Sequence, residues 1–155
     1  MKYAALALIA CLSLFNQSVH AAAAPQAEPE FILPAGVSPD DPEAAELAMQ
    51  YFTLGPSFVT NYDGSGRLKY LKADISVLAR LTAQPYLERH LPYIRNRLVV
   101  LFSGQLEETL QSTQGKEALR QQALVEIRHA LQMLETPSVA DQILELYFTS
   151  YVLQR

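Results

Sequence analysis

Cysteine is nearly absent from this sequence of 155 residues, in which Cys11 is the single one, and tryptophan does not occur. A lone cysteine excludes a disulfide framework and a cysteine-ligated metal site. Histidine is scarce as well, and neither His90 nor His129 belongs to a His-x-x-x-His or His-Glu-x-x-His pattern. The residues therefore predict no metal site.

A strong excess of one charge is also missing, because the net charge is only -4. The basic residues are scattered singly. This distribution does not favour a nucleic-acid partner. The sequence has no nucleophile elbow and no phosphate-binding glycine loop, and the adjacent Glu107 and Glu108 point to different sides of a helix. We therefore expect no catalytic residue, cofactor or small-molecule substrate, and we interpret Gly64 and Gly66 as a hairpin turn.

An apolar run follows Lys2 and ends before Asn16, and small residues gather at Ala21. A basic start, a short apolar stretch and small residues at the end are typical of a secretory signal peptide. Residues 1–21 are thus predicted to be a cleaved signal that sends the chain to the periplasm. An alternative stays open, since the tetrapeptide that ends at Cys11 resembles a lipobox, and an acylated Cys11 would anchor the chain to a membrane.

Residues 22–49 are rich in proline and acid. The stretch 25–49 contains five prolines and six acidic residues without one basic residue. Such composition is typical of an extended, self-repelling linker. The folded domain is expected to span residues 50–155.

Strand signals open that domain. Tyr51–Leu54 and Phe58–Tyr62 are rich in aromatic and β-branched residues, with a bend at Gly55 and Pro56. Asn61–Gly66 supplies a turn. The returning strand alternates apolar and mostly polar residues with a period of two, and its apolar set is Leu71, Ala73, Ile75, Val77, Ala79 and Leu81. A β-bulge is expected near Tyr70.

Helical patterns follow, after a short turn predicted at Pro85–His90. Pro92 is expected to open the main helix, whose apolar stripe is Ile94, Leu98, Leu101 and Phe102. A second helix, capped by Ser112 or Thr113 and closed by Thr136 and Pro137, has the stripe Leu119, Ala123, Ile127, Leu131 and Leu134.

The last segment, Ile143–Leu153, is rich in β-forming residues. Leu144, Leu146, Phe148 and Val152 are assigned to one face, and Tyr147, Thr149, Tyr151 and Leu153 to the other. Two apolar faces favour a central strand or one covered on both sides. Tyr147, Phe148 and Tyr151 are interpreted as core and cross-strand residues rather than as a base-stacking platform. The element order predicts an α+β fold, an antiparallel sheet with helices on one face.

Five segments in this order resemble the periplasmic domain of the flagellar FliL family. They are Tyr51–Asn61 with the glycine turn after it, Tyr70-Leu71-Lys72, His90–Arg95, Ser112–Arg120 and Leu146–Gln154. The resemblance implies a stomatin-like fold and a non-enzymatic domain. It also implies association with flagellar stator or basal-body proteins, homo-oligomer rings or scaffolds, and support of motility.

One departure from the family pattern is the signal peptide, because FliL proteins typically keep an N-terminal membrane helix. A cleaved chain would lack its own anchor and would act beside a membrane-anchored FliL. The alternative function, from another class, is a periplasmic adaptor or ligand-binding module unrelated to flagella. An enzyme would need a convergent polar pocket, which the sequence does not indicate.

Overall fold

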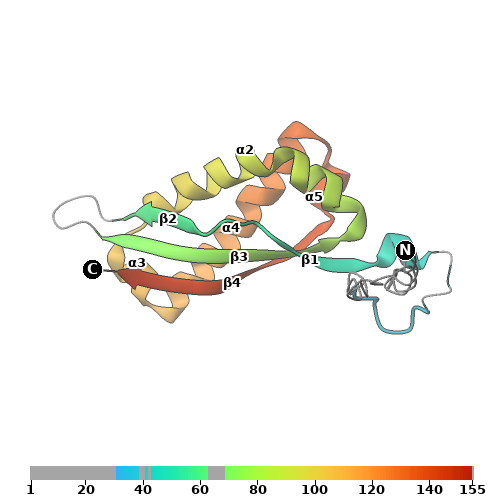
Figure 1. Cartoon of the computed structure of the whole chain (residues 1–155), viewed down its shortest axis with the longest axis horizontal. Helices are drawn as coiled ribbons and strands as arrows, with labels where there is room; N and C mark the ends of the chain where they lie inside the picture. The colour runs from blue at the N-terminus through green and yellow to red at the C-terminus, as the bar shows by residue number, and fades with distance from the viewer. Residues whose placement is uncertain (1–30, 39–40, 42, 63–68, 155) are drawn as a thin grey trace, which may run out of the picture.

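Strands and helices follow one another in an α+β order over the residues that the computed structural model describes, which are 31–38, 41, 43–62 and 69–154 (Figure 1). The strands are β1 (Met49–Thr53), β2 (Phe58–Asn61), β3 (Tyr70–Arg80) and β4 (Ile143–Gln154). The long helices are α2 (Gln84–Ser103) and α4 (Thr113–Leu134), and the short ones are α1 (Ala44–Leu47), η1 (Leu81–Ala83), α3 (Glu107–Gln111) and α5 (Pro137–Ala140).

Strand β3 is the centre of an antiparallel sheet. β1 and β2 pair one after the other along one edge of β3, and β4 pairs along its other edge. The predicted alternation is confirmed from 71 to 79, because the side chains at 71, 73, 75, 77 and 79 are buried and those between them are not. Leu81, predicted as the last apolar residue of this strand, lies instead in η1 and is only half-buried. The predicted hairpin is also present, since β2 pairs with β3 out to Asn61 and Tyr70. Most of its turn lies outside the described residues.

Strand β4 corrects three predictions. It pairs only with β3 among the described strands, so it is an edge strand and not a central one. The bulge expected near Tyr70 is absent, and the register shifts lie instead at Leu144 and Thr149 of β4. The extra residue at Thr149 reverses the facing of the residues after it, because a strand alternates with a period of two. Val152 is therefore exposed, against the prediction.

Helix α2 begins earlier than predicted. The turn expected at Pro85–His90 and the helix start at Pro92 are wrong, because one helix runs from Gln84 to Ser103 with Pro92 inside it. Pro92 cannot donate a backbone hydrogen bond, but the buried face continues on both sides of it. That face is Leu87, Ile94, Leu98 and Phe102, while Leu101 is half-buried.

Ser112 caps helix α4, as predicted, because its Oγ accepts a hydrogen bond of 2.9 Å from the backbone N–H of Gly115. Its predicted stripe is buried except for Leu134, which is 43% exposed. The helix ends at Leu134, and Thr136 caps the short α5 rather than closing α4.

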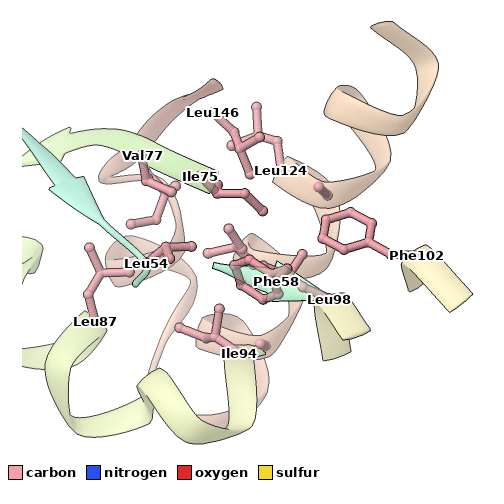
Figure 2. Packing of buried hydrophobic residues seen from close by; sticks show 14 of the residues in the cluster. Leu54, Phe58, Ile75, Val77, Leu87, Ile94, Leu98, Phe102, Leu124 and Leu146 are labelled. Atoms are coloured by element: carbon pink, nitrogen blue, oxygen red, sulfur yellow. The ribbon is translucent and has the colours of Figure 1, made fainter. Parts of the chain in front are cut away.

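The core lies between one face of the sheet and helices α2 and α4. Side chains from the sheet and from both helices meet there. Figure 2 shows this for Phe58 of β2, Ile75 of β3, Leu98 of α2 and Leu124 of α4. The rings of Phe58 and Phe102 pack edge to face with centroids 5.6 Å apart. The predicted α+β fold, an antiparallel sheet with helices against one face, is therefore confirmed.

Part of the predicted linker contacts this domain. α1 lies within it, Ala44 and Ala48 are buried, and Ile32 forms a two-hydrogen-bond bridge with Met49 at the end of β1. The predicted signal residues 1–21 lie outside the described residues. Within the described ranges, no helix is both long enough and apolar enough to span a bilayer.

Candidate interaction surface

His90 lies at the contact between α2 and the end of α4. Its Nε2 is 2.6 Å from Oε1 of Glu135, the C-cap residue of α4, and Arg89 donates to the same oxygen at 3.0 Å. The hydrogen bond from His90 lowers the pKa of Glu135 below its ordinary value, and Arg89 acts in the same direction. This cluster links α2 to the end of α4, so the role of His90 is structural.

The other polar residues considered in the sequence do not converge. His129 and Glu108 are exposed, and Glu107 forms an ion pair with Lys69 rather than being fully solvated as predicted. No group of three or more histidine, cysteine, aspartate or glutamate side chains is placed to hold a metal ion in the described part of the chain.

Phe148 and Tyr151 belong to the helix side of the sheet. Their rings are 5.3 Å apart, and the Tyr151 hydroxyl donates to the carbonyl oxygen of Leu110. Burial raises the pKa of Tyr151 to about 12. The prediction that these two aromatic side chains are core residues is confirmed, whereas Tyr147 lies on the opposite, open face and is 40% exposed.

A hollow of about 630 Å³ lies where β3 ends, and Arg80, Thr82, Glu46 and Asp141 are among its lining residues. The hollow is open to solvent. Arg80 Nη1 donates to the Glu46 carbonyl oxygen at 3.3 Å, and Thr82 Oγ1 donates to the amide oxygen of Gln142 at 3.1 Å. These polar groups thus bond one another, and the hollow does not enclose a small molecule.

Arginines of α4 cover one edge of the sheet. Arg128 donates to the carbonyl oxygens of Ile143 and Leu144 at 2.9 and 3.0 Å, and Arg120 donates to that of Leu146 at 3.0 Å. An added strand would need such edge carbonyls as acceptors, so their occupation obstructs pairing along the first half of β4.

Arg95 of α2 binds backbone carbonyl oxygens at the opposite edge of the sheet, which β1 and β2 form. Its Nη1 donates to the carbonyl oxygens of Leu54 and Pro56, between β1 and β2, and its guanidinium carbon lies 4.2 Å from the centre of the Phe58 ring. Sequence reasoning missed all three arginines. Their partners lie 15 to 41 residues away along the chain, and no local pattern signals such contacts.

The sheet face that turns away from the helices carries rows of side chains across three strands. The pairing aligns Val59, Lys72 and Val152 in one row, Thr53, Ser76 and Tyr147 in another, and Tyr51, Leu78 and Glu145 in the next. The rings of Tyr51 and Tyr147, from opposite edges, pack with centroids 5.9 Å apart. We call this surface the open face.

Two opposite charges lie in the middle of the open face. Lys72 and Asp74 are two residues apart on β3, so their side chains point to the same side. Lys72 is exposed and Asp74 is half-buried, and neither belongs to an ion pair within the described ranges. The open face thus offers aromatic and valine side chains around a lysine and an aspartate that have no ion-pair partner in the described part of the chain.

Comparison with known proteins gives one match. A search of the curated proteins found none, whereas the family model described as "Flagellar basal body-associated protein FliL" matches residues 51–154. The match covers β2 to β4 and the last three residues of β1, the part of the sequence that carries the resemblance noted above. The chain belongs to the FliL family of flagellar basal body-associated proteins.

Proposed function

We propose that this protein is a non-enzymatic accessory component of the flagellar motor, which associates with stator or basal-body proteins and supports motility as part of a ring or scaffold. Membership of the FliL family over residues 51–154 is the single observation that carries the proposal. The proposed fold relationship is to the stomatin-like domains, which the α+β arrangement accommodates.

The geometry supports an assembly role. Large apolar side chains are exposed on the open face, as they are at several positions of α2 and α4, and the polar side chains considered for catalysis are dispersed or engaged in ion pairs. Binding proteins need such a surface, whereas an enzyme needs convergent groups in a concave site.

The proposed location is the periplasm, reached by the signal peptide that residues 1–21 resemble. A cleaved chain would act beside motor proteins that carry their own membrane anchors, a membrane-anchored FliL among them. Acylation at Cys11 is the alternative route to the same membrane.

A deletion strain tests this function. Swimming should decrease most under viscous load, where stator engagement limits torque, and the wild-type chain supplied in trans should restore it. A tagged chain should recover stator, basal-body or FliL-type proteins from the same cells. Normal motility at every load, together with a pull-down that contains no motor protein, would contradict the proposal and favour the adaptor unrelated to flagella.

A further inference from the structure

Strand β1 keeps unpaired backbone groups on its outer edge. Leu54, the residue after β1, donates its N–H to the Ile75 carbonyl oxygen of β3 at 2.9 Å. Bonded pairs recur at every second residue of an antiparallel ladder, so the even-numbered residues of β1 bond to β3 and the odd-numbered ones point outwards. The outward N–H and C=O groups of Tyr51 and Thr53 have no backbone partner among the described residues.

One outward residue of β1 is already paired. Met49 donates its N–H to the Ile32 carbonyl oxygen at 2.8 Å, and Ile32 donates its N–H to the Met49 carbonyl oxygen at 2.7 Å. Both bonds are exchanged between the same two residues, which defines a hydrogen-bonded antiparallel pair. Wherever this pairing continues, residues before Ile32 lie opposite residues after Met49.

The register of that continuation is fixed. Glu30 is two residues before Ile32 and would lie opposite Tyr51, and Glu28 would lie opposite Thr53. Both would be hydrogen-bonded pairs, because such pairs alternate with non-bonded ones along an antiparallel ladder. The unpaired backbone groups of β1 thus have matching donors and acceptors in the chain just before the described bridge.

The sequence suits this register. Pro29 falls between the two bonded positions, where the backbone nitrogen of a strand residue points away from β1. Proline has no N–H and is found in sheets at such edge positions. Its neighbours Glu28 and Glu30 are charged, and charge on an outermost strand discourages pairing with yet another chain.

The available edge ends at Thr53. The chain leaves β1 at Leu54, and Arg95 binds the carbonyl oxygens of Leu54 and Pro56 there. A longer added strand would lose those acceptors. Residues 28–30 are as long as the edge that remains.

We propose that residues 28–30 pair with β1 as a further antiparallel edge strand, which continues the pair formed by Ile32 and Met49. The occupant is this chain's own segment, because the described bridge holds its end at the edge and raises its effective concentration above that of a separate strand. The added strand closes this edge against pairing with other proteins.

This pairing goes beyond the proposed function and does not rest on it. It determines where the N-terminal tether leaves the domain, which is beside Thr53 at the far end of β1. For the alternative in which Cys11 is acylated, the chain between Cys11 and residue 28 then limits the distance of the domain from the membrane to about 60 Å. The tests use the purified chain without motor proteins, so the two proposals fail independently.

Amide hydrogen exchange tests the backbone pairing. Glu30→Pro removes the N–H that donates to the Tyr51 carbonyl oxygen, and the Tyr51 amide should then exchange about tenfold faster or more than in the wild type. Ala27→Pro is the control, because the backbone nitrogen at this position would point away from β1, as at Pro29. It should leave the exchange of the Tyr51 amide unchanged.

A pair of cysteines tests the register. Glu30→Cys with Tyr51→Cys, in a chain that also carries Cys11→Ser, places the two thiols at opposite positions, where Cα atoms are about 5.5 Å apart and a disulfide is possible. Mild oxidation of the dilute protein should join them within one chain. Glu28→Cys with Tyr51→Cys, two residues out of register, is the control and should form this disulfide much more slowly.

Three results would overturn the proposal. One is a Tyr51 amide that exchanges at the same rate in the wild type and in both proline variants. Another is equal oxidation of the two cysteine pairs, which would show that no register is defined. The third is a disulfide that forms only between chains, which would assign this edge to a strand of a second copy.

Discussion

Arg95 lies over the ring of Phe58, with 4.2 Å between the guanidinium carbon and the ring centre, and the same side chain holds the carbonyl oxygens that flank the bend between β1 and β2. One residue of α2 thus satisfies two backbone acceptors and covers one aromatic face. This contact ties the helix layer to an edge of the sheet where β1 and β2 are not continuous.

Replacing Arg95 by lysine should therefore lower the free energy of unfolding by about 1–3 kcal/mol, because a single ammonium cannot reproduce the planar guanidinium contacts. Urea denaturation measures this loss. Arg89→Lys is the control, since the Arg89 side chain is 61% exposed and its ion pair with Glu135 lies at the surface. Equal losses for both variants would contradict the role assigned to Arg95.

Gly115 at the start of α4 should not tolerate alanine. A Cβ at this position would lie 1.9 Å from the carbonyl oxygen of Thr109, a backbone atom that has to move with α3. Gly115→Ala should cost about 1–3 kcal/mol or more in unfolding free energy. Gly104→Ala is the matched control, because a Cβ there meets nothing closer than 3.7 Å. Similar thermal unfolding midpoints for the two variants would disprove the close approach of α3 and α4.

Leu98 tests the buried face of α2. Its side chain is fully buried beside Ile94 and Phe102, and Leu98→Ala should destabilise the protein by about 2–5 kcal/mol. Arg97→Ala removes a partly exposed contact with Glu126 and should change stability much less than Leu98→Ala does. Urea melts in which Arg97→Ala is the more harmful change would show that the helix faces are assigned wrongly.

Acid should weaken the contact between α2 and the end of α4. The pKa of Glu135 is lowered in the folded protein by the hydrogen bond from His90 and by Arg89, so folding favours its ionised form. This stabilisation is complete above the ordinary pKa of 4.5 and is lost as the pH falls through the lowered folded value.

The same sign applies to Glu117, whose pKa falls to about 2 through hydrogen bonds from Arg120 and Gln121. We expect the urea midpoint to decrease as the pH falls from about 5 to about 2. Glu135→Gln should make that decrease shallower, whereas Glu108→Gln should not. A pH profile that is identical in all three proteins would show that the Glu135 contact is not formed.

Much of the fold was predictable because it depends on local periodicity. The alternation of β3 and the buried stripe of α4 are repeated patterns, so several residues indicate the same element and the same buried face. Pro92 was misread because proline signals a helix start locally, whereas burial of Leu87 and Ile94 on both sides keeps it inside a helix. The facing of Val152 was missed because a single extra residue at Thr149 is invisible in composition.

The candidate surface was less predictable, because it depends on contacts between distant segments. Tyr51 and Tyr147 lie in strands at opposite ends of the domain sequence and meet only through their common neighbour β3. The arginine contacts at the edges depend on how the helices cross the sheet, which no single segment encodes.

The position of β3 between its partners also determines when the domain is able to fold. β3 pairs with β2, its neighbour in the sequence, in a hairpin. Its other partner, β4, is separated from it by helices α2 to α5 (Figure 1). Long-range strand pairing of this kind is slow, and β4 is synthesised after every other described strand and helix. Until β4 is made, β3 has one unpaired edge and the core is incomplete, so we expect the nascent domain not to complete its fold before then. Under the export proposed above, that delay would keep the chain unfolded while it crosses the membrane.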